Sequence, residues 1–134
     1  SSNSTTVKSV YNVDGVIKEK LNKFLYGDEI SLKELPDECY LDFDAVQKIA
    51  VKIIYYYRDL NKNVCKKIEK LSSDESSESV VERAKLEEEK KAIYERFNKV
   101  SANFTKKICD MYMRAKFGSS LGKDTHQDGQ ENVK

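Results

Sequence analysis

Three cysteines and one histidine are the side chains of this 134-residue chain best suited to nucleophilic or metal chemistry. Cys39, Cys65 and Cys109 include no CxxC pair, and His126 falls in a polar stretch near the end of the sequence. A structural zinc site needs four ligands at recognisable spacing, and a Cys–His nucleophile needs both groups in one folded region. Neither arrangement is indicated, and an odd number of unpaired cysteines is typical of reduced thiols. We therefore expect no metal site and no catalytic cysteine.

Other catalytic signatures are missing from the sequence as well. There is no Ser/His/Asp set, no Gly-rich phosphate loop and no helical Glu-x-x-His motif. Carboxylates are plentiful, but their spacing places them on the polar faces of helices rather than in a common cleft. We expect a protein that is not an enzyme and binds no cofactor.

Basic and aromatic side chains are interleaved between residues 99 and 116. Five bases stand there against one acid, a net charge of +4, at Lys99, Lys106, Lys107, Arg114 and Lys116. Such a face can contact phosphates and stack bases, which makes nucleic-acid binding an alternative hypothesis. Residues 28–44 hold seven acids and one base, a net charge of −6. The favoured interpretation is that this acidic segment balances the basic face.

Two serines in the stretch SSDESSES, residues 72–79, have an acid three residues further on. Ser72 precedes Glu75 and Ser79 precedes Glu82, a pattern that acid-directed kinases accept, so both are candidate phosphorylation sites. Ser79 with Glu82 also fits a capping box, which makes a solvated helix cap the plainer interpretation of that serine.

The candidate side chains described above are positioned by helices, which the spacing of the apolar residues predicts. A continuous stripe with steps of three and four predicts one long helix over residues 43–71. Asp42 or Asp44 can cap its N-terminus. The stripe consists of Phe43, Val46, Ala50, Ile53, Tyr57, Leu60, Val64, Ile68 and Leu71.

A second long stripe predicts a helix over about residues 79–117, ended by Gly118. The polar turn before it makes the two long helices antiparallel neighbours. Folding the chain at residue 75 or 76 places Ile53 opposite Phe97, and Tyr57 opposite Ile93 or Tyr94. This stripe consists of Ile93, Phe97, Val100, Phe104, Ile108, Met111 and Ala115.

A shorter helix over about residues 13–26 completes the predicted fold. It is followed by a connector, residues 28–42, in which Pro36 forbids a long helix and five apolar residues favour packing against the bundle. The predicted fold class is all-α, a three-helix bundle built on a long antiparallel hairpin. We expect residues 1–9 to be flexible, residues 10–117 to form the helical domain, and residues 118–134 to be a disordered tail.

The sequence favours a function in protein binding. Across from the far end of the second helix lie mainly charged residues, so part of the stripe there is expected to be half covered. We expect a partner helix or segment to bind Tyr55, Tyr56, Leu60, Val64, Ile68 and Leu71. A second copy of the chain is an alternative partner. The three cysteines without paired spacing favour an intracellular protein, cytoplasmic or nuclear, and the lack of a long apolar run predicts no membrane span.

Overall fold

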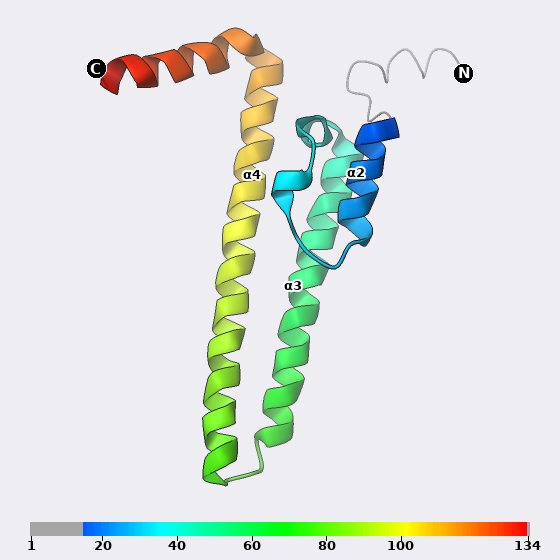
Figure 1. Ribbon diagram of the computed structural model, residues 1–134, viewed down its shortest axis with the longest axis vertical. Coiled ribbons are helices and arrows are strands. Elements are labelled where there is room, and N and C mark those ends of the chain that lie inside the picture. The colour runs from blue at the N-terminus through cyan, green and yellow to red at the C-terminus, as the bar shows by residue number, and fades with distance from the viewer. Residues whose placement is uncertain (1–14, 134) are drawn as a thin grey trace. The chain divides into compact units, whose positions relative to one another are not determined.

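The protein is all-α, as predicted. In a computed structural model, the backbone is described for residues 15–133 and the side chains for residues 15–118. Figure 1 shows the order of elements: α2 (Gly15–Tyr26), two 3₁₀ turns (Leu32–Glu34 and Asp37–Leu41), α3 (Phe43–Leu71) and α4 (Ser77–Val133). No strand occurs in residues 15–133. The predicted flexible segment 1–9 lies outside the described residues.

The described chain groups into two compact units, which we treat separately. Unit 1 contains residues up to 47 together with residues from 104 onward, and unit 2 contains residues 48–103. Helices α3 and α4 each contribute to both units. The predicted long helix 43–71 matches α3 in its bounds, and α4 begins two residues before the predicted start at residue 79.

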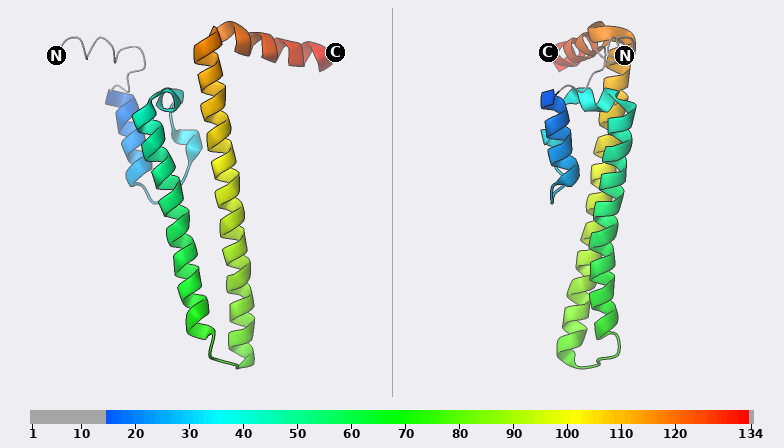
Figure 2. Two further views of the ribbon diagram at one scale, coloured as in Figure 1. Left: turned by 180° about the vertical axis from the view of Figure 1, so that it is seen from behind. Right: turned by 90° about the vertical axis from the view of Figure 1, so that its right-hand side faces the viewer.

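Unit 2 is a pair of antiparallel helices joined by a short turn, as both views in Figure 2 show. The ring of Tyr57 meets the ring of Phe97 edge-on, with centroids 5.8 Å apart. Tyr57 also lines one groove with Ile93 and Tyr94, the residues that the predicted register places opposite it, and Phe97 lies one helical turn further along α4. Near the turn, the guanidinium of Arg83 in α4 donates a hydrogen bond to the carbonyl of Leu71, the last residue of α3, at 2.7 Å.

The turn between α3 and α4 is fixed by side-chain caps. The Ser76 side chain accepts a hydrogen bond from the Ser79 N–H at 3.2 Å, and the Ser76 carbonyl accepts one from the Val80 N–H at 3.0 Å. Ser76 is thus the N-cap, and the predicted cap at Ser79 is wrong. Asp74 explains the difference, because its carboxylate accepts both the Ser76 N–H at 3.0 Å and the Ser79 hydroxyl at 2.6 Å.

The N-terminal end of α3 buries a different face from the one predicted. Its cap is Asp42, whose Oδ1 accepts the Asp44 N–H at 3.2 Å. Phe43 is 81% exposed, whereas Ala45 and Ile49 are fully buried. The sequence here carries two adjacent apolar stripes, and both satisfy helical spacing. The buried stripe consists of Ala45, Ile49, Ile53, Tyr57 and Val64.

In unit 1 the connector packs against α4, as expected. Tyr40, from the second 3₁₀ turn, lies with its ring centroid 5.9 Å from that of Phe104. Lys107 forms an ion pair with Asp37 at 3.0 Å and its Nζ lies 5.9 Å from the Tyr40 ring. The predicted balance between the acidic connector and the basic helix is therefore realised at this pair. The other buried apolar residues of unit 1 are Leu21, Phe24, Leu35, Cys39, Ala45 and Met111.

Helix α4 is interrupted at Gly118, the residue predicted to end it. Gly118 has φ 78° and ψ 177°, a backbone conformation that a residue with a Cβ adopts only with strain. Beyond Gly118 the backbone follows a second helical stretch to Val133. The predicted disorder of residues 118–134 in solution stays a prediction, and the side chain of His126 lies outside the described residues.

Candidate functional site

A groove of about 770 Å³ runs between α3 and α4 within unit 2. Helix α3 supplies one wall and helix α4 supplies the other, so the two antiparallel helices position every side chain of the groove. The lining residues are Ile54, Tyr57, Arg58 and Asn61 from α3, and Glu87, Glu88, Lys90, Lys91, Ile93, Tyr94 and Phe97 from α4.

The floor of the groove is apolar and its lips are exposed. Tyr57 and Ile93 are 8% and 4% exposed, and burial raises the pKa of the Tyr57 hydroxyl above its ordinary value, with Arg96 opposing the shift. On the lips, Ile54 of α3 is 50% exposed and Tyr94 of α4 is 66% exposed. An isoleucine and a tyrosine that remain largely in water beside a buried apolar floor form a surface suited to another apolar group.

Charged side chains surround the apolar part on the side nearer the turn. Among residues 15–118, no ion pair within 4.0 Å engages Glu87, Glu88, Lys90 or Lys91. Arg58, on the opposite wall, lies 3.8 Å from the Asp59 carboxylate and 4.4 Å from the centroid of the Tyr55 ring.

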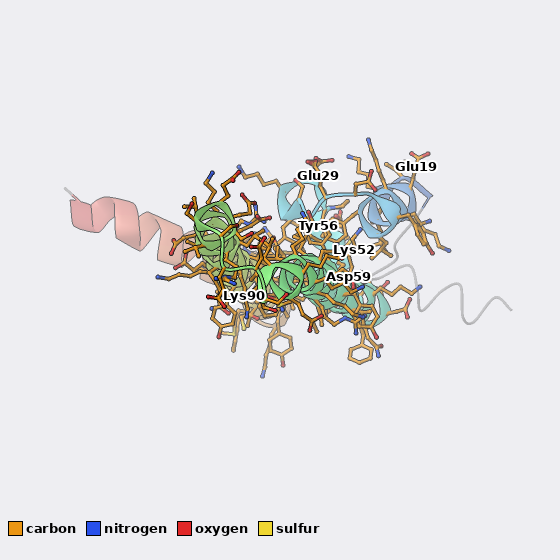
Figure 3. The ribbon with its side chains drawn as sticks, turned by 90° about the horizontal axis from the view of Figure 1, so that it is seen from below. Glu19, Glu29, Lys52, Tyr56, Asp59 and Lys90 are labelled. Atoms are coloured by element: carbon orange, nitrogen blue, oxygen red, sulfur yellow. The ribbon has the colours of Figure 1, made fainter. Side chains whose placement is uncertain are left out.

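The residues predicted to bind a partner do not lie on one surface. Val64 is 3% exposed because it lies within the hairpin seam, and Leu60, Ile68 and Leu71 are half-buried. Tyr55 is 52% exposed, and Tyr56 is half-buried with its ring 5.0 Å from that of Tyr57. Figure 3 shows Tyr56 and Lys90 on opposite sides of the hairpin. Tyr56 therefore does not share a surface with the groove.

Sequence reasoning missed the two lips of the groove. Ile54 directly follows the core residue Ile53, and Tyr94 directly follows the core residue Ile93. Helical spacing alone does not separate such a residue from the core. A helix turns by about 100° per residue, so the second residue of an apolar pair lies at the edge of the seam. Apolar pairs at Ile53–Ile54 and Ile93–Tyr94 were thus the available signal for a groove.

The candidate nucleic-acid residues divide between paired and unpaired groups. Lys106 donates to Asp110 at 2.9 Å, which lowers the pKa of that carboxyl, and Lys107 pairs with Asp37. Lys116 lies 5.7 Å from the ring centroids of both Tyr112 and Phe117. The other two candidates, Lys99 and Arg114, are exposed. Contacts from Lys106 or Lys107 to phosphate would have to replace an existing carboxylate.

The two candidate phosphorylation sites differ in access. Ser72 is exposed, and its hydroxyl donates to the Glu69 carbonyl at 2.7 Å. Ser79 is only 7% exposed, and its hydroxyl is held by Asp74. That hydrogen bond to Ser79 is the main reason why the pKa of Asp74 lies below its ordinary value. Modification of Ser79 would require the turn to open.

Comparisons with protein-family models, with curated proteins and with solved structures find no match to this chain. Within the described part of the chain, no group of three or more His, Cys, Asp or Glu residues could hold a metal ion. No described helix combines the length and apolar character needed to cross a membrane. The cysteines are free thiols, with Cys39 buried, Cys65 half-buried and Cys109 exposed.

Proposed function

We propose that this chain is a non-enzymatic protein-interaction domain of an intracellular multi-subunit assembly, and that it binds a helix of its partner in the groove of unit 2. The observation that carries the proposal is the pair of exposed lips, Ile54 and Tyr94, on either side of the buried Tyr57 and Ile93. Complete burial of an isoleucine from water contributes about 1.5–3 kcal/mol, so covering the exposed half of Ile54 would contribute about half of that amount.

A helix fits this groove better than an extended strand. The groove lies between two helices, so its sides are rows of side chains with helical spacing, and ridges of a third helix can pack between them. No strand edge is present in residues 15–133 to support pairing with an extended segment. The α4 wall from residue 87 to residue 97 rises by about 15 Å, which corresponds to nearly three helical turns.

A displayed library of helical peptides tests the proposal directly. The full chain would be immobilised at low density, so that peptides rather than neighbouring copies reach the groove. We expect selection of amphipathic helical peptides whose binding is weakened at least about tenfold by Ile54→Asp or Tyr94→Asp, because a carboxylate there would be desolvated.

The matched control is Val81→Asp, which places the same charge on another apolar residue of α4. Val81 is 55% exposed and does not line the groove. Peptides that bind all three variants equally, or a selection that yields no helical peptide, would contradict the proposal. Circular dichroism of each variant would establish that the helices remain intact.

A further inference from the structure

Helix α4 carries a second stripe beside the one that forms its core. The core stripe of unit 2 includes Ser79, Leu86 and Ile93, all buried. The second stripe advances by steps of four, three, four, three and four residues, which is heptad spacing. Every member is exposed, including Val80 at 48% and Tyr94 at 66%. The stripe consists of Val80, Ala84, Glu87, Lys91, Tyr94 and Asn98.

The second stripe is complementary to itself when it is read in the opposite direction. Reversal about position 89 exchanges Glu87 with Lys91, so that each acid meets a base. The same reversal places the small Ala84 opposite the large ring of Tyr94. Glu88 and Lys90 flank the stripe on opposite sides, so the two-fold arrangement brings each of them beside its own copy rather than beside the other. Within the stripe, two antiparallel copies of α4 would therefore match in charge at Glu87–Lys91 and in size at Ala84–Tyr94, while Val80 would meet Asn98 toward its ends.

We infer that the helix bound in the groove is α4 of a second copy of this chain, packed antiparallel about a two-fold axis near residue 89. This inference rests on the proposed function, because it uses the same groove and names its occupant. A two-fold interface repeats each contact, so two Glu87–Lys91 pairs and two Ala84–Tyr94 contacts would form. Ile54 on the neighbouring wall would be covered by the same partner helix.

Glu89, the residue at the two-fold axis, does not oppose this arrangement. Glu89 is its own counterpart under the reversal, but it lies about 160° around the helix from Glu87 and from Lys91. It therefore faces away from the second stripe and away from its own copy. Within residues 15–118, neither Glu87 nor Lys91 forms an ion pair. This agrees with an interface in which their partners come from the second copy.

Charge reversal tests the inference because the predicted contacts are reciprocal. Sedimentation equilibrium of the full chain should show a monomer–dimer equilibrium. Glu87→Lys and Lys91→Glu should each weaken the dimer at least about tenfold, since each reversal converts two attractive pairs into repulsive ones. The double variant should dimerise within about threefold of the parent chain. An equimolar mixture of the two single variants should form heterodimers in preference to either homodimer.

Glu89→Lys and Lys85→Glu are the matched controls, because both residues are exposed and lie off the second stripe. Both should leave the dimer unchanged, and circular dichroism would verify that every variant is folded. A chain that stays monomeric throughout would overturn the inference, as would a dimer whose single variants do not restore each other. Neither result would contradict the proposed function. That proposal fails only if the peptide selection yields no helical peptide whose binding depends on Ile54 and Tyr94.

Discussion

The apolar stripe of α4 is covered to different extents in the two units. In unit 1 the stripe residues Phe104 and Met111 are buried, and connector side chains supply much of the cover. In unit 2 the stripe is matched by a single helix, and the groove beside it keeps Ile54 and Tyr94 in water. The difference lies in the number of segments, since unit 2 consists only of two helices and their turn.

A pair of helices cannot enclose a core by itself. Each helix presents an apolar face more than 100° wide, and a single neighbour covers only part of that width. In unit 1 the connector provides additional cover, since its residues Leu35, Cys39 and Tyr40 are buried. Unit 2 has no equivalent segment, so part of its apolar width stays exposed at Ile54 and Tyr94, the surface that we propose binds a partner. The difference between the core and the groove in this protein is thus a difference in coverage rather than in residue type.

The same substitution in the two units should have very different consequences. Tyr40→Ala removes a ring that is 5% exposed and packed on Phe104, and we expect the free energy of unfolding to fall by about 3–5 kcal/mol. Tyr94→Ala removes a ring that is 66% exposed, and we expect a change within about 0.5 kcal/mol. Urea unfolding at a concentration where the chain is monomeric measures both values.

Hydrogen exchange sharpens this comparison by locating the effect. Tyr40→Ala should raise exchange rates in the connector and around residues 104–111, because those segments lose their shared contact. Equal losses of stability in the two tyrosine variants would show that the lip of the groove belongs to the core, and would remove the contrast between the units.

Alkaline pH should weaken unit 1 through Cys39. Burial, with smaller contributions from Glu38 and Asp42, raises the pKa of the Cys39 thiol from 9.0 to about 11. The folded state therefore holds the proton more tightly than the unfolded state, so this stabilisation is complete below pH 9 and is lost as the pH rises toward about 11. We expect the urea midpoint to fall over that interval.

Cys39→Ala separates this titration from that of its neighbour. The pKa of Tyr40 is raised from 10.0 to about 12 by burial, then by Cys39 and Asp37. The alanine variant should therefore keep a constant midpoint up to about pH 10 and decline only beyond it. An identical decline from pH 9 in both proteins would mean that the buried thiol is not the group responsible.

The bounds of the helices were the most predictable part of this fold. Helix α3 matches its predicted range because local signals mark both ends: Asp42 caps the start, and the polar run after Leu71 stops the apolar repeat. The position of the connector was also predictable, since its apolar residues could not remain in water. Each of these features depends on neighbouring residues, which a sequence displays directly.

The buried face at the start of α3 and the groove were less predictable, because they depend on choices between near-equivalent packings. Phe43 and Ala45 both satisfy helical spacing, and only the surroundings decide that Ala45 is buried. The cap of α4 also depends on more than spacing, because the carboxylate of Asp74 holds the Ser79 hydroxyl and leaves Ser76 as the cap. The apolar pairs Ile53–Ile54 and Ile93–Tyr94 mark the edge of the seam in the sequence, but only the packing decides that Ile54 and Tyr94 are the exposed members.

The smallest effect concerns charge rather than apolar coverage. Lys107 pairs with Asp37 in unit 1, but their side chains are 37% and 50% exposed, so we expect Lys107→Ala to lower the free energy of unfolding by no more than about 1 kcal/mol. Lys90→Ala, at a lysine without an ion pair in residues 15–118, should change it by less than about 0.5 kcal/mol. Urea unfolding in low salt and in 1 M NaCl should show the Lys107 effect shrinking with salt while the Lys90 value stays constant. A loss above about 2 kcal/mol at Lys107 that persists in salt would mean that its contact with the Tyr40 ring holds the connector in place, and the cover of unit 1 would then depend on a charged residue as well as on apolar ones.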